Sequence, residues 1–424
     1  MRFFSRSWGL TKIAGEGGAL IDSFKEAMLA TIRGQATASI PWVPRLDLWF
    51  NAQRQAGTLP AKYRRASLME MTDDLGWGFH AVIPDFRDLQ HSDDDLHRGL
   101  GVWNLGTMPC RTLFEDVDVL VERSGDRTTV EYHTPVGVVR TSTVYNQSMR
   151  DAGITISHVS ETAIKGCEDY DAVGYLFEHA RVVPNYQGFN RYMEAVGERG
   201  LTVARISGAA SPMHLLHKEL MSPILLFYEM YDHPDELSRC AERIGAYFER
   251  LFEVALASPA QVLHLGGNYD AAMLPPPFFA KYLTPWLRRF AERAHAQAKF
   301  LLCHTDGENE GNLDEYLMSG MDIADSVCPA PMTSLTLRQI RDAFAGKVTI
   351  MGGIPSVALL RDSMGDREFE SFLDKFFGEL GAGDHIILGV SDTTPPAAEF
   401  DRLVAVHERV KAFGPVRSTA ESSA

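Results

Sequence analysis

The second half of the chain alternates short apolar runs with longer amphipathic segments. Runs such as 201–208, 260–268 and 299–307 are apolar and end in glycine or a polar residue, which is typical of buried strands. Segment 235–257 repeats apolar residues at steps of three and four, which predicts a long amphipathic helix. Because the two patterns keep alternating, the sequence predicts parallel βαβ units.

These units predict an α/β fold, and more specifically a closed (β/α)8 barrel of the TIM type. The strands are short and the units are many, which favours a barrel over an open sheet. The glycine-rich stretches 266–271 and 351–356 match neither GxGxxG nor GxxxxGK[ST]. A phosphate-binding loop is therefore not expected.

The amino-terminal third does not follow this rhythm. Residues 20–34 predict a helix, and residues 39–51 predict a strand. Alternating runs joined by a Ser-Gly-Asp turn predict a β-rich insertion over 114–146, which could act as a lid or a subunit contact. The expected domain plan is a flexible segment 1–18, one barrel domain 19–413 and a flexible tail 414–424.

Composition and charge narrow the class of protein. Apolar residues make up 45% of the chain and the net charge is −15, which argues against a nucleic-acid partner. The five cysteines form no CxxC pair, which favours a reducing compartment over a disulfide framework. No run resembles a signal peptide or is long enough to span a bilayer. We therefore expect a cytoplasmic protein with no membrane partner.

Candidate chemistry gathers where the predicted strands end, which is where parallel barrels place their active sites. The polar and glycine residues at these ends are His264, Asn268, His304, Asp306, Asp325, Cys328, Gly352, Gly353, Ser391 and Asp392. The spacing of His304 and Asp306 puts both side chains on one face of an extended strand, whereas Cys303 should face the core. 

Each of these residues has more than one interpretation. His304 could be a general acid or base, a metal ligand, or a histidine that stabilises a loop. Asp306 could orient His304, bind a metal or cap the next helix, and Asp392 could be a ligand or a cap. Cys328 is equally explained as a small buried hydrophobic side chain.

A second polar cluster lies upstream. Arg45 and Asp47 alternate with leucines and would share one face of the predicted strand. Arg54, Arg64 and Arg65 follow in a chain that is acidic overall, which suggests an anionic or carboxylate-bearing ligand. For Arg64 and Arg65 a solvated helix face explains the charge equally well.

Three stretches resemble one enzyme superfamily. RQAGTLPAKYR at 54–64 resembles the amino-terminal signature of uroporphyrinogen decarboxylase, RQAGRYLPEYR, although Thr58 stands where those enzymes have a second arginine. The wider pattern is closer to the methyltransferase branch of that superfamily, which acts with corrinoid proteins or thiols. HTDG at 304–307 and GVSDTTPP at 389–396 fall where that branch has H-x-C-G and a late P-G-C.

The resemblance implies a metal set that this chain alters. In the methyltransferase branch the histidine and two cysteines bind zinc, but here Asp306 and Asp392 stand at the cysteine positions. A set of His304 with two aspartates is harder, so it suits an oxygen substrate better than a thiol even if it holds zinc. The predicted catalytic and metal residues are His304, Asp306 and Asp392, and the predicted substrate-binding residues are Arg45, Asp47, Arg54, His264, Asn268 and Cys328.

Three functions are compatible with this site. The leading one is a methyltransferase that takes a methyl group from a small O-methyl substrate and passes it to a corrinoid (cobalamin) on a separate protein, with zinc or a proton donor polarising the oxygen. The alternative is a decarboxylase or lyase in which Arg45 and Arg54 hold a carboxylate and Asp306 or His304 supplies a proton. A non-catalytic ligand-binding barrel is the third. The superfamily also implies a homodimer.

Overall fold

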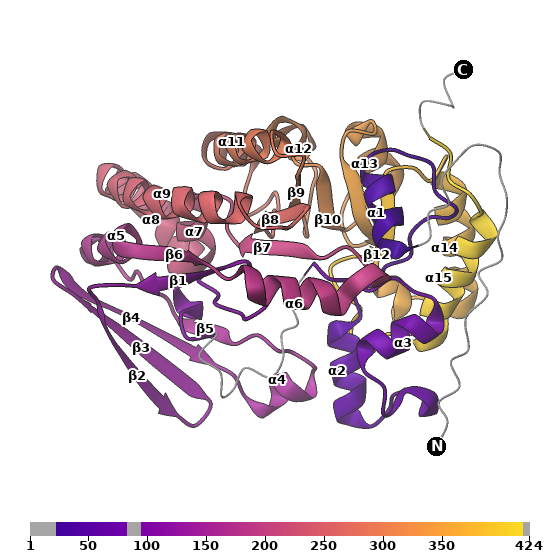
Figure 1. The fold of residues 1–424 in the computed structure, drawn as a ribbon, viewed down its shortest axis with the longest axis horizontal. Coiled ribbons are helices and arrows are strands. Elements are labelled where there is room, and N and C mark those ends of the chain that lie inside the picture. The colour runs from indigo at the N-terminus through magenta and orange to yellow at the C-terminus, as the bar shows by residue number, and fades with distance from the viewer. Residues whose placement is uncertain (1–22, 83–94, 419–424) are drawn as a thin grey trace.

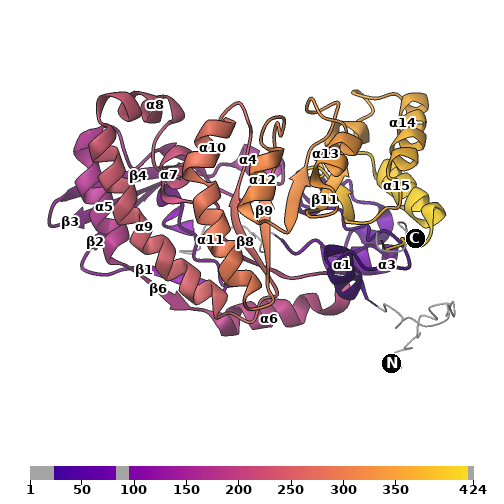
Figure 2. The same ribbon diagram turned by 90° about the horizontal axis from the view of Figure 1, so that it is seen from above.

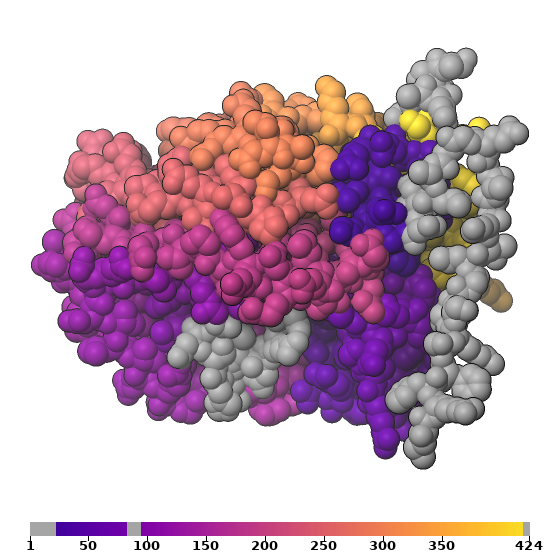
Figure 3. All heavy atoms as spheres, in the orientation of Figure 1, coloured from indigo at the N-terminus to yellow at the C-terminus, as the bar shows by residue number. Residues whose placement is uncertain are grey.

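The computed structural model describes residues 23–82 and 95–418 of the 424-residue chain. They form a mixed α/β architecture whose centre is a six-stranded parallel sheet (Figure 1). The predicted flexible segment 1–18 and the last part of the predicted tail, 419–424, lie outside the described residues. Figure 3 shows how the described segments pack side by side on one face of the molecule.

The central sheet confirms the predicted α/β class. Its strands follow one another in space in the same order as in the chain, and every pair is parallel. They are β7 (Val203–Ser207), β8 (Val262–Gly267), β9 (Phe300–His304), β10 (Ile323–Val327), β11 (Thr349–Ile354) and β12 (Ile386–Val390). All residues of β8, β10, β11 and β12 are buried, as expected for a parallel sheet covered on both faces.

Two extended segments connect the edges of this sheet. Residues 40–43 lie beside β12 and residues 77–82 lie beside β7. The connecting backbone hydrogen bonds run from Val43 to Leu388 (2.8 Å), from Val203 to Ala81 (3.2 Å) and from Gly78 to Trp42 (2.9 Å). These contacts form no regular strand ladder, so the closed eight-stranded barrel stays a prediction.

One to three α-helices follow each of these strands and cover the sheet from outside (Figures 1 and 2). They are α7 (Pro212–Leu215), α8 (Pro223–Asp232), α9 (Pro234–Leu256), α10 (Pro276–Tyr282), α11 (Thr284–His295), α12 (Leu313–Ser319), α13 (Leu337–Phe344), α14 (Asp366–Glu379) and α15 (Phe400–Phe413). Gly320 ends α12 in the left-handed conformation, with φ of 75°. α10 and α11 are two helices and not one, because Pro285 cannot donate the backbone hydrogen bond that would continue α10.

The amino-terminal region contains the main error of the sequence reading. The predicted helix at 20–34 is present as α1 (Phe24–Ile32), capped by the Ser23 hydroxyl. Of the predicted strand 39–51, however, only the first part is extended, and α2 (Asp47–Ala56) follows. Leu46, Trp49 and Phe50 are all buried, and a spacing of three and four is the pattern of a helix packed on a core. Arg45 and Asp47 therefore do not share a strand face.

The remaining elements build a smaller layer beside the parallel sheet (Figure 1). An antiparallel sheet contains β2 (Asp118–Ser124), β3 (Arg127–Thr134), β4 (Gly137–Val144) and β5 (His158–Glu161), in that order. Three of these strands fall within the predicted insertion 114–146. The other elements are β1 (Cys110–Phe114), which pairs with β6 (Ala180–Pro184), and α3 (Leu68–Leu75), α4 (Gln147–Asp151), α5 (Tyr170–His179) and α6 (Tyr186–Val196).

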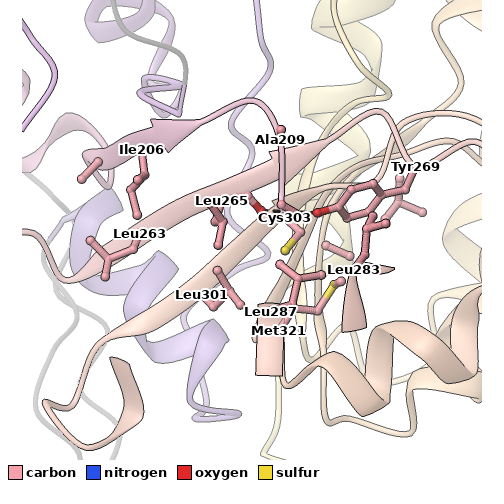
Figure 4. Close-up of a cluster of buried hydrophobic side chains, with 14 of the residues drawn as sticks. Ile206, Ala209, Leu263, Leu265, Tyr269, Leu283, Leu287, Leu301, Cys303 and Met321 are labelled. Carbon is pink, nitrogen blue, oxygen red and sulfur yellow. Dashed lines mark hydrogen bonds between the residues drawn. The ribbon is translucent and has the colours of Figure 1, made fainter. Parts of the chain in front are cut away.

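The two faces of the central sheet carry different side chains. On β9, Leu301 and Cys303 face the helices and pack in a cluster with Leu287 of α11 (Figure 4). Leu302, between them, belongs to a second cluster on the opposite face. Alternation along the strand therefore confirms that Cys303 faces the core, and it turns His304 to the other side.

The described part of the predicted tail remains attached to the body. Val416 is buried and exchanges two backbone hydrogen bonds with Thr37, at 3.0 and 3.2 Å. The five cysteines are all free thiols. Within the described ranges, no helix has both the length and the apolar character needed to cross a membrane.

Candidate active site

His304 is the centre of a cluster of carboxylates at the end of β9. It is buried, with 8% of its surface exposed. Its Nδ1 lies 2.7 Å from an oxygen of Asp325, the residue opposite it in the register of β9 with β10. Its Nε2 lies 3.4 Å from Asp392 and 3.7 Å from Asp306. The structure thus brings together the three residues predicted as catalytic, with Asp325 behind them.

The charges of this cluster depend on one another. Burial lowers the pKa of His304, but the hydrogen bonds that its ring donates to Asp306, Asp325 and Asp392 outweigh burial and raise the pKa well above the usual value. Burial raises the pKa of Asp325, yet the neighbouring histidines His304 and His80 bring it below its usual range. At neutral pH the ring is therefore an imidazolium held by carboxylates.

Arg45 connects the amino-terminal segment to the last strand end. Its guanidinium donates to Asp392 at 2.8 Å and to Asp47 at 3.1 Å. The pKa of Asp392 is about 2, because His304 and Arg45 stabilise the carboxylate more than burial disfavours it. Arg45 and Asp47 are paired at the start of α2, so they meet without sharing the strand face that was predicted for them.

Asn268 and Lys218 extend the cluster on its other side. The Asn268 amide donates to Asp306 at 3.1 Å, and its oxygen accepts from the Lys218 ammonium at 2.6 Å. Lys218 also donates to the carbonyl groups of Gly208 and Gly267, each at 3.1 Å. It lies in a π-helical turn, Leu216–Leu220, and such turns are frequent at functional sites.

The backbone at these strand ends is strained. Asn268, Ser326 and Asp392 have φ of 62°, 62° and 53°, a left-handed region that costs residues with a side chain of the order of 1–3 kcal/mol. Such strain persists where surrounding contacts hold the conformation. At Asp392 this conformation places the carboxylate beside His304, and at Asn268 it places the amide beside Asp306.

Two partly buried cations near the site, Arg205 and Lys218, were not predicted from the sequence. Arg205 lies opposite His264 in the register of β7 with β8, and burial together with Arg98 and Arg45 lowers its pKa to about 10. Burial and the same kind of repulsion lower the pKa of Lys218 to about 8. For Arg205 the available signal was a charged residue inside a predicted buried strand, because charged side chains are rarely placed there without a function or a partner.

His264 and Cys328 lie beside the cluster, but both are uncharged. The His264 ring is 6.4 Å from the His304 ring, and its Nε2 is 3.0 Å from the Gly266 carbonyl. Burial keeps its pKa well below the usual value, so it is neutral. Burial also raises the pKa of Cys328 to about 12, so this residue is a protonated thiol and not a ready metal ligand.

A cavity of about 470 Å³ adjoins the cluster. Asp47 and His80 line it, and they contact the site directly, since Asp47 binds Arg45 and His80 lies 3.8 Å from Asp325. Arg54 also lines this cavity, from α2. Arg54 is therefore separate from the carboxylate cluster but faces a space large enough for a small molecule.

The donor atoms of His304, Asp306 and Asp392 fit a divalent metal ion. They lie within 4.8 Å of one another, and the 3.4 and 3.7 Å separations at Nε2 approach the spacing of ligands around an ion bound at about 2.0–2.2 Å. Asp325 accepts a hydrogen bond from Nδ1 of His304. In metal sites, a carboxylate in this position orients the metal-bound histidine. This donor set has one nitrogen and two oxygen ligands.

Comparisons with known proteins identify no family for this chain. No protein-family model matches the chain, and no curated protein sequence matches it. Among solved structures, a methyltransferase from Methanosarcina mazei overlaps 92% of this chain and 99% of its own, at 13% identity and a TM-score of 0.47. An overlap this loose assigns neither a family nor an activity.

Proposed function

We propose that this chain is a methyltransferase that removes a methyl group from the oxygen of a small substrate and transfers it to a corrinoid on a separate protein. The observation that carries the proposal is the convergence of His304, Asp306 and Asp392, with Asp325 fixing the imidazole from behind. A cluster of this kind permits more than one reaction. The motifs at 304–307 and 389–396 resemble those of the methyltransferase branch described above, and they favour methyl transfer.

The proposal includes a closed barrel. Residues 40–43 and 77–82, which connect β12 to β7, would be its first two strands. His304, Asp392 and Arg45 would then lie at one rim, where the carboxyl ends of the strands meet. The cavity lined by Asp47 and His80 would admit the substrate beside them.

The chemistry breaks the bond between the methyl carbon and the substrate oxygen. The methyl group leaves for the acceptor, the bonding electron pair stays on the oxygen, and the oxygen takes up a proton. His304 would donate that proton from Nε2, while Asp325 holds Nδ1 and keeps the ring oriented. A zinc ion bound at Nε2 by His304 with Asp306 and Asp392 would replace that proton, and it would then supply Lewis acidity toward the oxygen in place of the proton donor.

Decarboxylation is the second candidate, and the partly buried cations favour it. Arg205 and Lys218 lie near His264 and Asn268, where they could hold a substrate carboxylate. The bond to a second carboxylate would break, carbon dioxide would leave, and His304 would protonate the carbon that keeps the electron pair.

The test is an assay of purified protein with a panel of methoxylated compounds and a reduced corrinoid protein. We expect methylated corrinoid and the demethylated compound in equal amounts, both lost in His304→Ala. His295→Ala is the matched control, because His295 also pairs with an aspartate, Asp322, at 2.9 Å, but on the helix side of the sheet. Carbon dioxide release without corrinoid would replace the proposal with the second candidate, and no turnover in either assay would leave a ligand-binding protein.

A further inference from the structure

A second group of metal-ligating side chains lies where α5, α8 and α9 meet, at one end of the molecule (Figures 1 and 2). Cys167 opens the 3₁₀ turn Cys167–Asp169 that leads into α5. Glu229 lies in α8, and His233 is the single residue between α8 and α9. A Cys167 sulfur, a Glu229 oxygen and a His233 nitrogen lie within 4.8 Å of one another. None of these residues belongs to the site around His304.

The backbone fixes this arrangement. The His233 N–H donates to the Glu229 carbonyl at 2.9 Å, and the Leu237 N–H donates to the His233 carbonyl at 3.0 Å. The two helices therefore meet without a flexible loop, and Pro234 starts the second one. Glu229 and His233, four positions apart, are on the same side of the helix end.

The carboxylate of Glu229 has a partner that metal sites commonly use. Glu229 is 7% exposed, and the Tyr170 hydroxyl, also buried, donates to its Oε2 at 2.6 Å. Such a hydrogen bond orients a ligating carboxylate. Among the described residues, no lysine or arginine forms an ion pair with Glu229. A buried carboxylate without a cationic partner is costly, and a bound cation would remove that cost.

We propose that Cys167, Glu229 and His233 bind one zinc ion, with the fourth position open to water. A thiolate, an imidazole and a carboxylate are all ligands that zinc accepts in tetrahedral geometry. The thiolate makes this set softer than the one around His304, which has only nitrogen and oxygen donors. The ion would join the start of α5 to the corner between α8 and α9, and the Cys167 thiol would lose its proton on binding.

Cobalt(II) as a probe separates the two sites in the full-length, metal-free protein. A thiolate bound to cobalt gives a ligand-to-metal charge-transfer absorption, which nitrogen and oxygen ligands do not give. We expect this absorption in the wild type and in His304→Ala, and its loss in Cys167→Ser. His233→Ala should weaken cobalt binding by about tenfold or more. Cys240→Ser, which changes another thiol close to Tyr170, is the control and should keep the absorption.

Alkylation of the wild-type protein provides a test that does not depend on whether the variants fold. Zinc should protect Cys167 from alkylation, as followed by mass spectrometry of its peptide, while the buried Cys110 and Cys303 stay unreactive in both states. A wild-type protein without the thiolate absorption, an absorption that survives Cys167→Ser, or equal alkylation with and without zinc would overturn the proposal. These readouts do not depend on methyl transfer, so they are independent of the proposed function.

Discussion

The Nδ1 atom of His304 lies 2.7 Å from Oδ2 of Asp325, and the two residues stand opposite each other on neighbouring parallel strands. The strand register alone sets this contact, with no loop in between. The imidazole is therefore held in one orientation by the central parallel sheet itself. Its Nε2 is left to face the carboxylates of Asp306 and Asp392.

Asp325→Asn should reduce turnover by about 10–100-fold, because an amide no longer favours the imidazolium or fixes its orientation. The pKa of His304, followed by NMR, should fall toward the usual value. Asp322→Asn is the matched control, since Asp322 pairs with His295 away from the site. Full activity in Asp325→Asn would rule out the orienting role.

Arg45→Lys should lower activity and raise the pKa of Asp392 above its present value of about 2. Lysine cannot donate to Asp392 and Asp47 at once with the fork of a guanidinium. Arg341→Lys makes the comparison, because Arg341 forms a similar half-buried pair with Asp384, at 2.9 Å. Both variants should lose roughly 1–3 kcal/mol of unfolding free energy, measured by urea unfolding, but only Arg45→Lys should lose activity.

Gly267→Ala should displace His304 without altering any charged group. A methyl group at this position would lie 2.9 Å from Cβ of His304, too close for either atom to stay in place. We expect a loss of turnover of about 10-fold or more with a small change in substrate binding. Gly378→Ala, where nothing lies within 4 Å, should leave both unchanged.

Replacing Asn268 separates backbone strain from hydrogen bonding. Asn268→Gly and Asn268→Ala both remove the bridge between Lys218 and Asp306, so both should lose activity to the same extent. At φ of 62°, glycine is unstrained while alanine is not, so the glycine variant should be more stable by about 1 kcal/mol. Thermal unfolding of the two variants measures this difference in stability. Equal stability would contradict the inference that the backbone at residue 268 is strained.

The free energy of unfolding should depend on pH through His407, which lies away from the site. Burial, with a contribution from Lys411, lowers its pKa to about 4 in the folded protein, against about 6.5 in an unfolded chain. The unfolded state therefore binds more protons between these values, and stability should fall as the pH falls from 6.5 to 4. His407→Leu should lessen this fall by about 1–2 kcal/mol in urea unfolding at pH 4 relative to pH 7. A pH dependence unchanged by the substitution would contradict the assignment.

The fold was predictable where apolar runs were long and buried. β8, β10, β11 and β12 have every residue buried, so their runs had no competing interpretation. Segment 39–51 was misread, because its aromatic and branched residues suit a strand as well as a helix. Only the burial of Leu46, Trp49 and Phe50 together decides between the two.

The site was predictable as far as strand ends could be located. His304, Asp306 and Asp392 follow parallel strands, so their meeting required only the topology. The role of Asp325 depends on the register between β9 and β10. The apolar and polar pattern of a single strand does not determine which residue of the neighbouring strand lies opposite. Lys218 was missed for a related reason: its carbonyl partners, Gly208 and Gly267, come from two different strand ends.

The bond between Arg45 and Asp392 joins residues 347 positions apart. A ribosome must therefore release almost the whole polypeptide before this pair can form. A chain that ends between residues 304 and 392, or a folding intermediate that has not yet docked its final strand, would carry His304 without the carboxylate that joins it to Arg45. The complete set of charges around His304 therefore forms only when β12, the last strand of the parallel sheet, is in place.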